Sequence, residues 1–230
     1  SANVALGYAA LGANTTASYN TGIGYAALYD NTTGANNTAV GRDALSNNID
    51  ADDNTAVGSG SLDANTTGAN NTAVGRHALG ANTTASNNTA VGKSSLAANT
   101  TGTMNVAVGR EAGKSITTNS GCTMIGANAG QANTAANNTA LGSGALYANT
   151  SGTRNTALGT GTYGSTQGAL GSNTTGNNNV AVGNRSLTLN TTGEKNTAVG
   201  TYTLDANTTA DLSTAVGYQA MIANTTGTQN

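Results

Sequence analysis

Apolar and polar positions recur along this 230-residue chain with a period of 17 residues. The consensus unit begins Asn-Thr-Ala-Val-Gly, continues to Ala-Leu at positions eight and nine, and has a polar Asn-Thr-Thr-Gly stretch at positions twelve to fifteen. In all thirteen units position five is Gly, preceded by Val, Leu or Ile. Two units break the count: the one at Cys122 is one residue short, and the one at Asn155 carries seven extra residues at 160–166.

So short and strict a period is typical of a solenoid, in which each unit buries its apolar face only by stacking on the next. The run before the glycine predicts a short strand, Ala-Leu a second one, and Asn-Thr-Thr-Gly a turn. We therefore predict an all-β chain, a parallel β-roll or β-solenoid of about thirteen coils. It forms one repeat unit over 1–230, cut mid-repeat at both ends, with a loop around Tyr163.

Positions two, three and four suggest how the strand is oriented. Position two is Thr or Val in every unit and position four is always aliphatic, and strand side chains alternate between faces, so both share one face. We predict that they fill the interior with Leu at position nine. The interior column then contains Val40, Val57, Val74 and Val91.

Position three is Ala in eleven units, which indicates a second surface where another backbone comes close. The thin predicted core also favours association, and ring-closed symmetry is the usual solution. We therefore expect a homo-oligomer, with a trimer favoured. The expected contact residues are Ala39, Ala56, Ala73 and Ala90.

Composition excludes several partners. Charged residues make up 8% of the chain and the net charge is −2, which favours neither nucleic-acid binding nor a basic membrane surface. Apolar runs are only a few residues long, against the roughly 20 needed to span a bilayer, so we expect no membrane insertion. Cys122 is the only cysteine and has no catalytic partner, so it is read as a repeat substitution.

No pattern of catalytic residues emerges, so we predict a non-enzymatic protein without cofactor or metal. His77 stands alone. Asp50, Asp52 and Asp53 lack the glycine and the distal Glu of a calcium loop, and we interpret them as a variant turn.

Asparagine fills position twelve in twelve units, with Ile116 as the exception. We interpret this column as a ladder of amides that bond from coil to coil. The rival interpretation is N-glycosylation, because many of these residues, and four just before the strand, are formal Asn-x-Ser/Thr acceptors. The candidate acceptors are Asn14, Asn31, Asn36, Asn65, Asn70, Asn82, Asn87, Asn99, Asn137, Asn149, Asn173, Asn190, Asn207 and Asn224.

Position six varies, directly after the invariant glycine, so it is expected at a solvent-facing corner. Tyr, Arg and Lys repeated along such a corner could hold sugar rings or anionic glycans, and repetition would make the contact multivalent. A plain solvated corner is the alternative. The candidate glycan-binding residues are Tyr8, Tyr25, Arg42, Arg76, Lys93 and Arg110.

Three segments show the shared pattern most clearly. They are Asn-Thr-Ala-Val-Gly-Arg-His-Ala-Leu at 71–79, Asn-Thr-Ala-Val-Gly-Lys-Ser-Ser-Leu at 88–96 and Asn-Val-Ala-Val-Gly-Arg-Glu-Ala-Gly at 105–113. This pattern resembles the YadA-like head repeats of trimeric autotransporter adhesins, which also occur in phage tail fibres. The resemblance covers about half of each unit and implies a left-handed β-roll assembled as a trimer. It also implies an adhesive or structural fibre.

We therefore expect a structural or adhesive fibre segment that lies outside the cell, on a cell surface or on a virion. Its expected partner is a further copy of itself, and a cell-surface glycan is the candidate ligand. A glycosylated filament is one alternative. The other is an ice-binding solenoid that presents Thr ladders. Its drawback is that position two is predicted to face inward.

Overall fold

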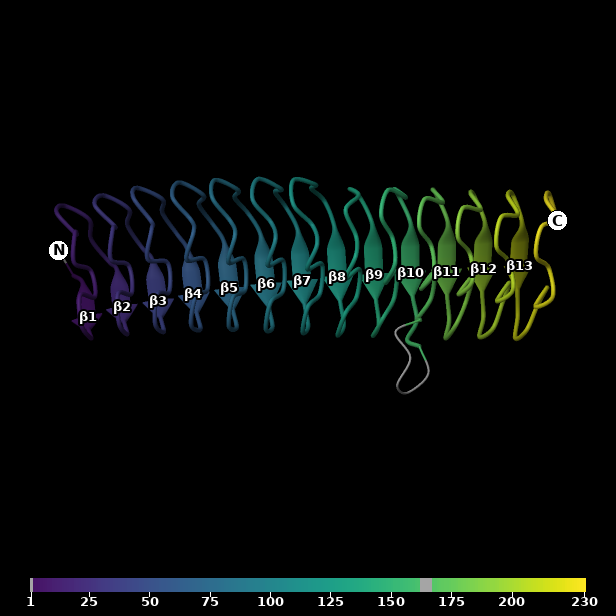
Figure 1. Ribbon diagram of the computed structural model, residues 1–230, viewed down its shortest axis with the longest axis horizontal. Coiled ribbons are helices and arrows are strands. Elements are labelled where there is room, and N and C mark those ends of the chain that lie inside the picture. The colour runs from purple at the N-terminus through teal and green to yellow at the C-terminus, as the bar shows by residue number, and fades with distance from the viewer. Residues whose placement is uncertain (1, 162–166) are drawn as a thin grey trace. The chain divides into compact units, whose positions relative to one another are not determined.

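The structure is a computed structural model that describes residues 2–161 and 167–230. It is all-β, with thirteen parallel three-residue strands at the 17-residue spacing, which confirms the predicted β-solenoid (Figure 1). The described residues include no helix, and hence none able to cross a membrane. The chain divides into two compact units, each of which contains several of the 17-residue repeats. The first unit is Ser1–Glu111 with Ile116–Ser120, and the second unit is Ala112–Ser115 with Gly121–Asn230.

Each unit places one strand in every coil, directly beside the strand of the next coil (Figure 1). The strands of the first unit are β1 (Val4–Leu6), β2 (Thr21–Ile23), β3 (Thr38–Val40), β4 (Thr55–Val57), β5 (Thr72–Val74), β6 (Thr89–Val91) and β7 (Val106–Val108). Those of the second unit are β8 (Thr123–Ile125), β9 (Thr139–Leu141), β10 (Thr156–Leu158), β11 (Val180–Val182), β12 (Thr197–Val199) and β13 (Thr214–Val216).

Equivalent positions pair throughout each unit. Thr38 pairs with Thr55, and Val40 with Val57. The register survives the longer repeat, because Thr156 pairs with Val180. The predicted loop around Tyr163 lies outside the described residues.

The strand faces are the reverse of those predicted. Ala39, Ala56, Ala73 and Ala90 are 0% exposed, whereas Val40, Val57 and Val91 are half-buried and Val74 is 36% exposed. Position three therefore points into the coil and positions two and four point out. The predicted interior valine column is wrong, and so is the chain-to-chain contact along the alanines, since these side chains have no surface left to offer.

Leucine at position nine is mostly buried, as predicted, but the described residues contain no second strand, because Ala-Leu lies in a turn. Leu28, Leu45, Leu62 and Leu79 have φ between +50° and +53°, the left-handed region. That conformation costs a non-glycine residue about 1–2 kcal/mol, which burial of a leucine side chain offsets. The left-handed turn carries each leucine inward beside the alanines, and it excludes a strand there.

The asparagine ladder is confirmed, and a second ladder accompanies it. At position twelve, Asn48 Nδ2 donates to Asn31 Oδ1 at 2.8 Å and to the Ala51 carbonyl at 3.0 Å. At position one, Asn37 Oδ1 accepts the backbone N–H of Asn54 at 2.9 Å. All these side chains are buried. The ladders satisfy polar groups of the turns inside the coil, where water would otherwise be needed.

Candidate recognition surfaces

The strand face, formed by positions two and four, is the first candidate surface. In the first unit it presents a column of Thr beside a column of Val, in register along the strands. These side chains are mostly half-buried, because stacked neighbours shield one another, and none of them is charged. The result is an uncharged face that mixes methyl groups with hydroxyls. β-Branched side chains suit such a pleated, half-exposed surface.

The corner at position six is the second candidate surface, and the prediction that it faces solvent is confirmed. Each position-five glycine turns the chain out of the strand with a positive φ, between +125° and +156°, and most position-six side chains are then exposed. Arg42 forms an ion pair with Asp43 at 3.5 Å, and Arg110 one with Glu111 at 3.3 Å. Their charges are thereby partly neutralised, although both arginines remain largely exposed.

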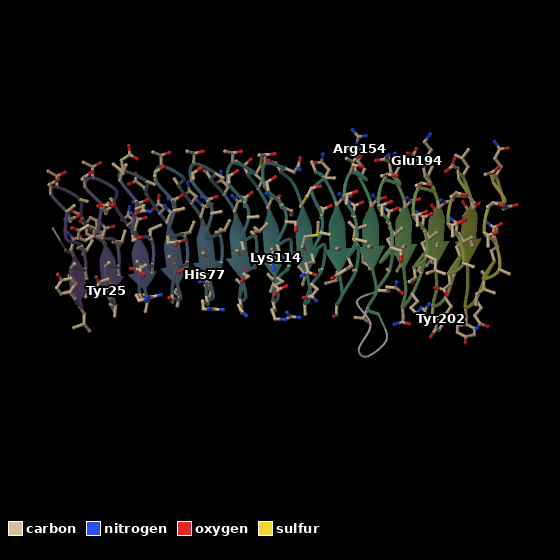
Figure 2. The ribbon with its side chains drawn as sticks, viewed as in Figure 1. Tyr25, His77, Lys114, Arg154, Glu194 and Tyr202 are labelled. Carbon is tan, nitrogen blue, oxygen red and sulfur yellow. The ribbon has the colours of Figure 1, made fainter. Side chains whose placement is uncertain are left out.

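Three tyrosines gather at the start of the first unit. The rings of Tyr8 and Tyr25 are stacked, with centroids 5.3 Å apart and planes 13° from parallel. With Ala9, Ala26 and Tyr29 they line a hollow of about 270 Å³. Figure 2 labels Tyr25 beside the N-terminal strands. We call these five residues the tyrosine hollow. The sequence indicated Tyr8 and Tyr25 as corner residues, but it gave no reason to join Tyr29, at position ten, to them.

A further cluster, in the second unit, was missed by sequence reasoning. The Arg185 guanidinium lies 5.4 Å from the ring centroid of Tyr202 and 3.4 Å from Asp205 Oδ2. Tyr202 meets the edge of Tyr218, with centroids 6.5 Å apart. Figure 2 places Tyr202 on one edge of the strands of this unit and Arg154 and Glu194 on the other. Arg185 and Tyr202 both stand at position seven of successive coils, so the repeat itself was the available signal.

Eight predicted glycosylation sites are contradicted, because their side chains are 0% exposed and their amides bond within the ladder. These residues are Asn31, Asn65, Asn82, Asn99, Asn149, Asn173, Asn190 and Asn207. The amides of the half-buried Asn14 and Asn224 also donate to carbonyls, those of Ala17 and Gly227. The four acceptors before the strand remain exposed, each with φ near +60°. These four are Asn36, Asn70, Asn87 and Asn137.

Three further polar residues, Asp52, Asp63 and Cys122, lie among groups of the fold itself. Asp52 Oδ1 accepts the backbone N–H of Ala35 at 2.7 Å, which agrees with the turn interpretation. Burial raises the pKa of the Asp63 carboxyl, and backbone hydrogen bonds at Asp63 and Ala64, together with nearby His77, oppose that rise. Burial also raises the pKa of the Cys122 thiol, whose Sγ donates to the Ala135 carbonyl at 3.2 Å. Within the described residues, no three His, Cys, Asp or Glu side chains gather as metal ligands.

Comparison with protein-family models, with curated proteins and with solved structures finds no match to the chain.

Proposed function

We propose that this chain is a non-enzymatic structural and adhesive segment of a fibre outside the cell, on a cell surface or a virion. The observation that carries the proposal is the continuous bonding between coils. Backbone pairing links each coil to its neighbour within both units, and two buried asparagine ladders add side-chain bonds between most of these coils. Force along the stack is then shared by many short, parallel bonds. The resemblance to YadA-like head repeats supports the same role.

The fibre is a homo-oligomer, with a trimer favoured, and its chains meet along the strand face. With the alanine column enclosed, this face is the surface that combines in-register strands, apolar methyl groups and absence of charge. Depletion of charge at the centre of a contact is the usual composition of protein interfaces. Burying the half-exposed valines would remove their remaining apolar surface from water, at about 25 cal/mol per Å².

Light scattering on the unmodified protein and on a strand-face variant tests this assembly. The variant carries Val57→Lys, Val74→Lys and Val91→Lys. It should have the mass of one chain with unchanged circular dichroism, because three charges would be desolvated at the contact. A matched control places lysine at the exposed position fourteen, with Thr67→Lys, Thr84→Lys and Thr101→Lys, and should keep the oligomeric mass. A single-chain mass for the unmodified protein, or an unchanged mass for the variant, contradicts the proposal.

The adhesive contact lies on the corner, and its basic part binds anionic glycans. Arg76, Lys93 and Arg110 occupy position six of successive coils and are exposed. A glycan array should show weak, multivalent binding that decreases when all three are changed to Ser. A matched control, Arg154→Ser with Lys195→Ser, removes exposed charge at position seventeen and should leave the binding unchanged. Binding that survives the triple change moves recognition away from this corner.

Ice binding is the second candidate function, and the reversed strand faces favour it. The sequence argued against ice binding because position-two threonines were predicted to face inward. In the structure position two faces outward, and its threonines form an in-register column of Thr38, Thr55, Thr72 and Thr89. Thermal hysteresis in freezing water, abolished by Thr55→Lys, Thr72→Lys and Thr89→Lys, would support this function. Its absence in the unmodified protein would rule it out.

A further inference from the structure

We propose that the tyrosine hollow binds one neutral pyranose ring of a glycan, an inference that rests on the adhesive function proposed above. It assigns a second ligand class to the corner surface. The basic residues Arg76, Lys93 and Arg110 bind anionic glycans through charge, whereas the tyrosine hollow binds an uncharged sugar through ring stacking.

The hollow is preformed by three rings from two positions of the repeat. Tyr8 and Tyr25 stack at position six of successive coils, and Tyr29 comes from position ten. A Cβ added at Gly12 would lie 2.8 Å from two ring carbons of Tyr29, so the absence of a side chain there lets this ring lie against the backbone. Rings that are held in place before binding reduce the entropic cost of binding a ligand.

The chemistry of the lining suits a sugar. Tyr8, Tyr25 and Tyr29 are 74%, 55% and 45% exposed, so ring surface and phenol groups are both accessible. The C–H face of a pyranose packs against aromatic rings, while phenol O–H groups donate to its hydroxyls and phenol oxygens accept from them. Small-molecule sites combine such apolar walls with a few polar groups.

The volume of the hollow and the charge of its lining narrow the class of ligand further. The volume of about 270 Å³ lies just below the roughly 300 Å³ at which ordinary small-molecule pockets begin, which fits a single ring better than a long segment. The residues that line the hollow are Tyr and Ala, and the lining contains no Asp, Glu, Lys, Arg or His. An uncharged ring therefore loses no ionic solvation on entry, whereas a carboxylate would find no counter-charge in the lining.

Saturation-transfer NMR on the full chain tests the proposal with methyl glucoside, methyl galactoside and methyl mannoside as neutral probes. Methyl glucuronide is the matched anionic probe. We expect saturation of the ring protons of at least one neutral glycoside and a weaker effect on the glucuronide. Tyr25→Ala and Tyr29→Ala should each weaken binding of that glycoside roughly tenfold, since each removes one aromatic contact. Tyr147→Ala changes the other position-ten tyrosine, outside the hollow, and should have no effect.

The outcomes separate this proposal from the adhesive fibre itself. No saturation of any neutral glycoside, while the protein keeps its oligomeric mass, overturns the hollow but leaves the fibre standing. Neutral-sugar binding that persists in both tyrosine variants also overturns it. So does glucuronide binding alone, lost only in the Arg76, Lys93 and Arg110 variant. If Tyr25→Ala instead lowers the oligomeric mass, the hollow is a contact between chains and the sugar site is wrong.

Discussion

The invariant glycine at position five shows how one residue type can be required in every coil. Gly75 has φ of +135°, and a Cβ there would lie 2.6 Å from the carbonyl carbon and oxygen of Gly92 in the next coil. Conformation and space both exclude a side chain, so the corner forms only with glycine.

Gly75→Ala should therefore destabilise the fold by more than about 3 kcal/mol, or prevent folding, because strain and backbone overlap add. Gly80→Ala is the matched control. Gly80 is not in the left-handed region, its nearest neighbour to an added Cβ is 3.4 Å away, and Ala97 already occupies the same unit position. We expect a change within about 1 kcal/mol there, by urea titration. Equal losses at both glycines would mean that the corner is not stacked as described.

The position-twelve ladder has a gap that reveals its chemistry. Asn99 Oδ1 is buried and has no partner, because the following coil offers Ile116 in place of a donor amide. Asn65, by contrast, sits inside the ladder: its amide donates to Asn48 Oδ1 at 3.1 Å and to the Gly68 carbonyl at 2.9 Å.

Asn65→Ala should lower the free energy of unfolding by about 1–3 kcal/mol, since it leaves the buried Asn48 Oδ1 without its donor, while the Gly68 carbonyl keeps the amide of Asn54 at 2.9 Å. Asn47→Ala removes an exposed asparagine from the neighbouring position eleven and should change stability by less than about 0.5 kcal/mol. Chemical denaturation measures both. A loss at Asn65 no larger than that at Asn47 would show that the ladder contributes no net stability.

At the scale of the element, the sequence predicts the strands, their parallel stacking and the asparagine ladder, because the repeat brings equal positions together. Alternation also places positions two and four on one face, but it does not say which face is inside. Treating the larger apolar side chains as interior led to the wrong choice. The enclosed space is narrow, so alanine fits beside a leucine that arrives from the left-handed turn, and no local pattern in Ala-Leu revealed that turn.

One sequence signal could have given the correct orientation. Position three is Met only at Met124, and in that same coil position nine is Gly130 where most units have Leu. The Met124 sulfur occupies the space that a side chain on Gly130 would take. A large residue at one position thus replaces a large residue at the other, which shows that positions three and nine fill one space inside the coil.

A double-mutant cycle tests this exchange. Met124→Ala alone should leave a cavity and cost about 2–5 kcal/mol, and Gly130→Leu alone should overpack and cost about 1–3 kcal/mol. The double variant restores the consensus Ala and Leu, and its loss of stability should be much smaller than the sum of the losses in the two single variants. Denaturant titration of the four proteins gives the coupling energy, and additive losses would contradict the shared space.

At the scale of the whole molecule, each coil depends mainly on its neighbours, so a complete coil should be removable. Deleting residues 54–70 from the first unit brings Asn71 next to Asn37 and Thr72 next to Thr38, with the same residue types in both ladders and in the strand register. The deletion protein should fold, with a free energy of unfolding lower by about 1–3 kcal/mol, the ordinary share of 17 residues. Deleting only residues 54–62 removes β4 and its corner but leaves the rest of that coil, so the strands on either side lose a partner. This smaller deletion should cost more than the larger one, as circular dichroism and urea titration would show. A greater loss from the whole-coil deletion would mean that stability depends on contacts beyond neighbouring coils, and the stacked, nearest-neighbour account of the molecule would fail.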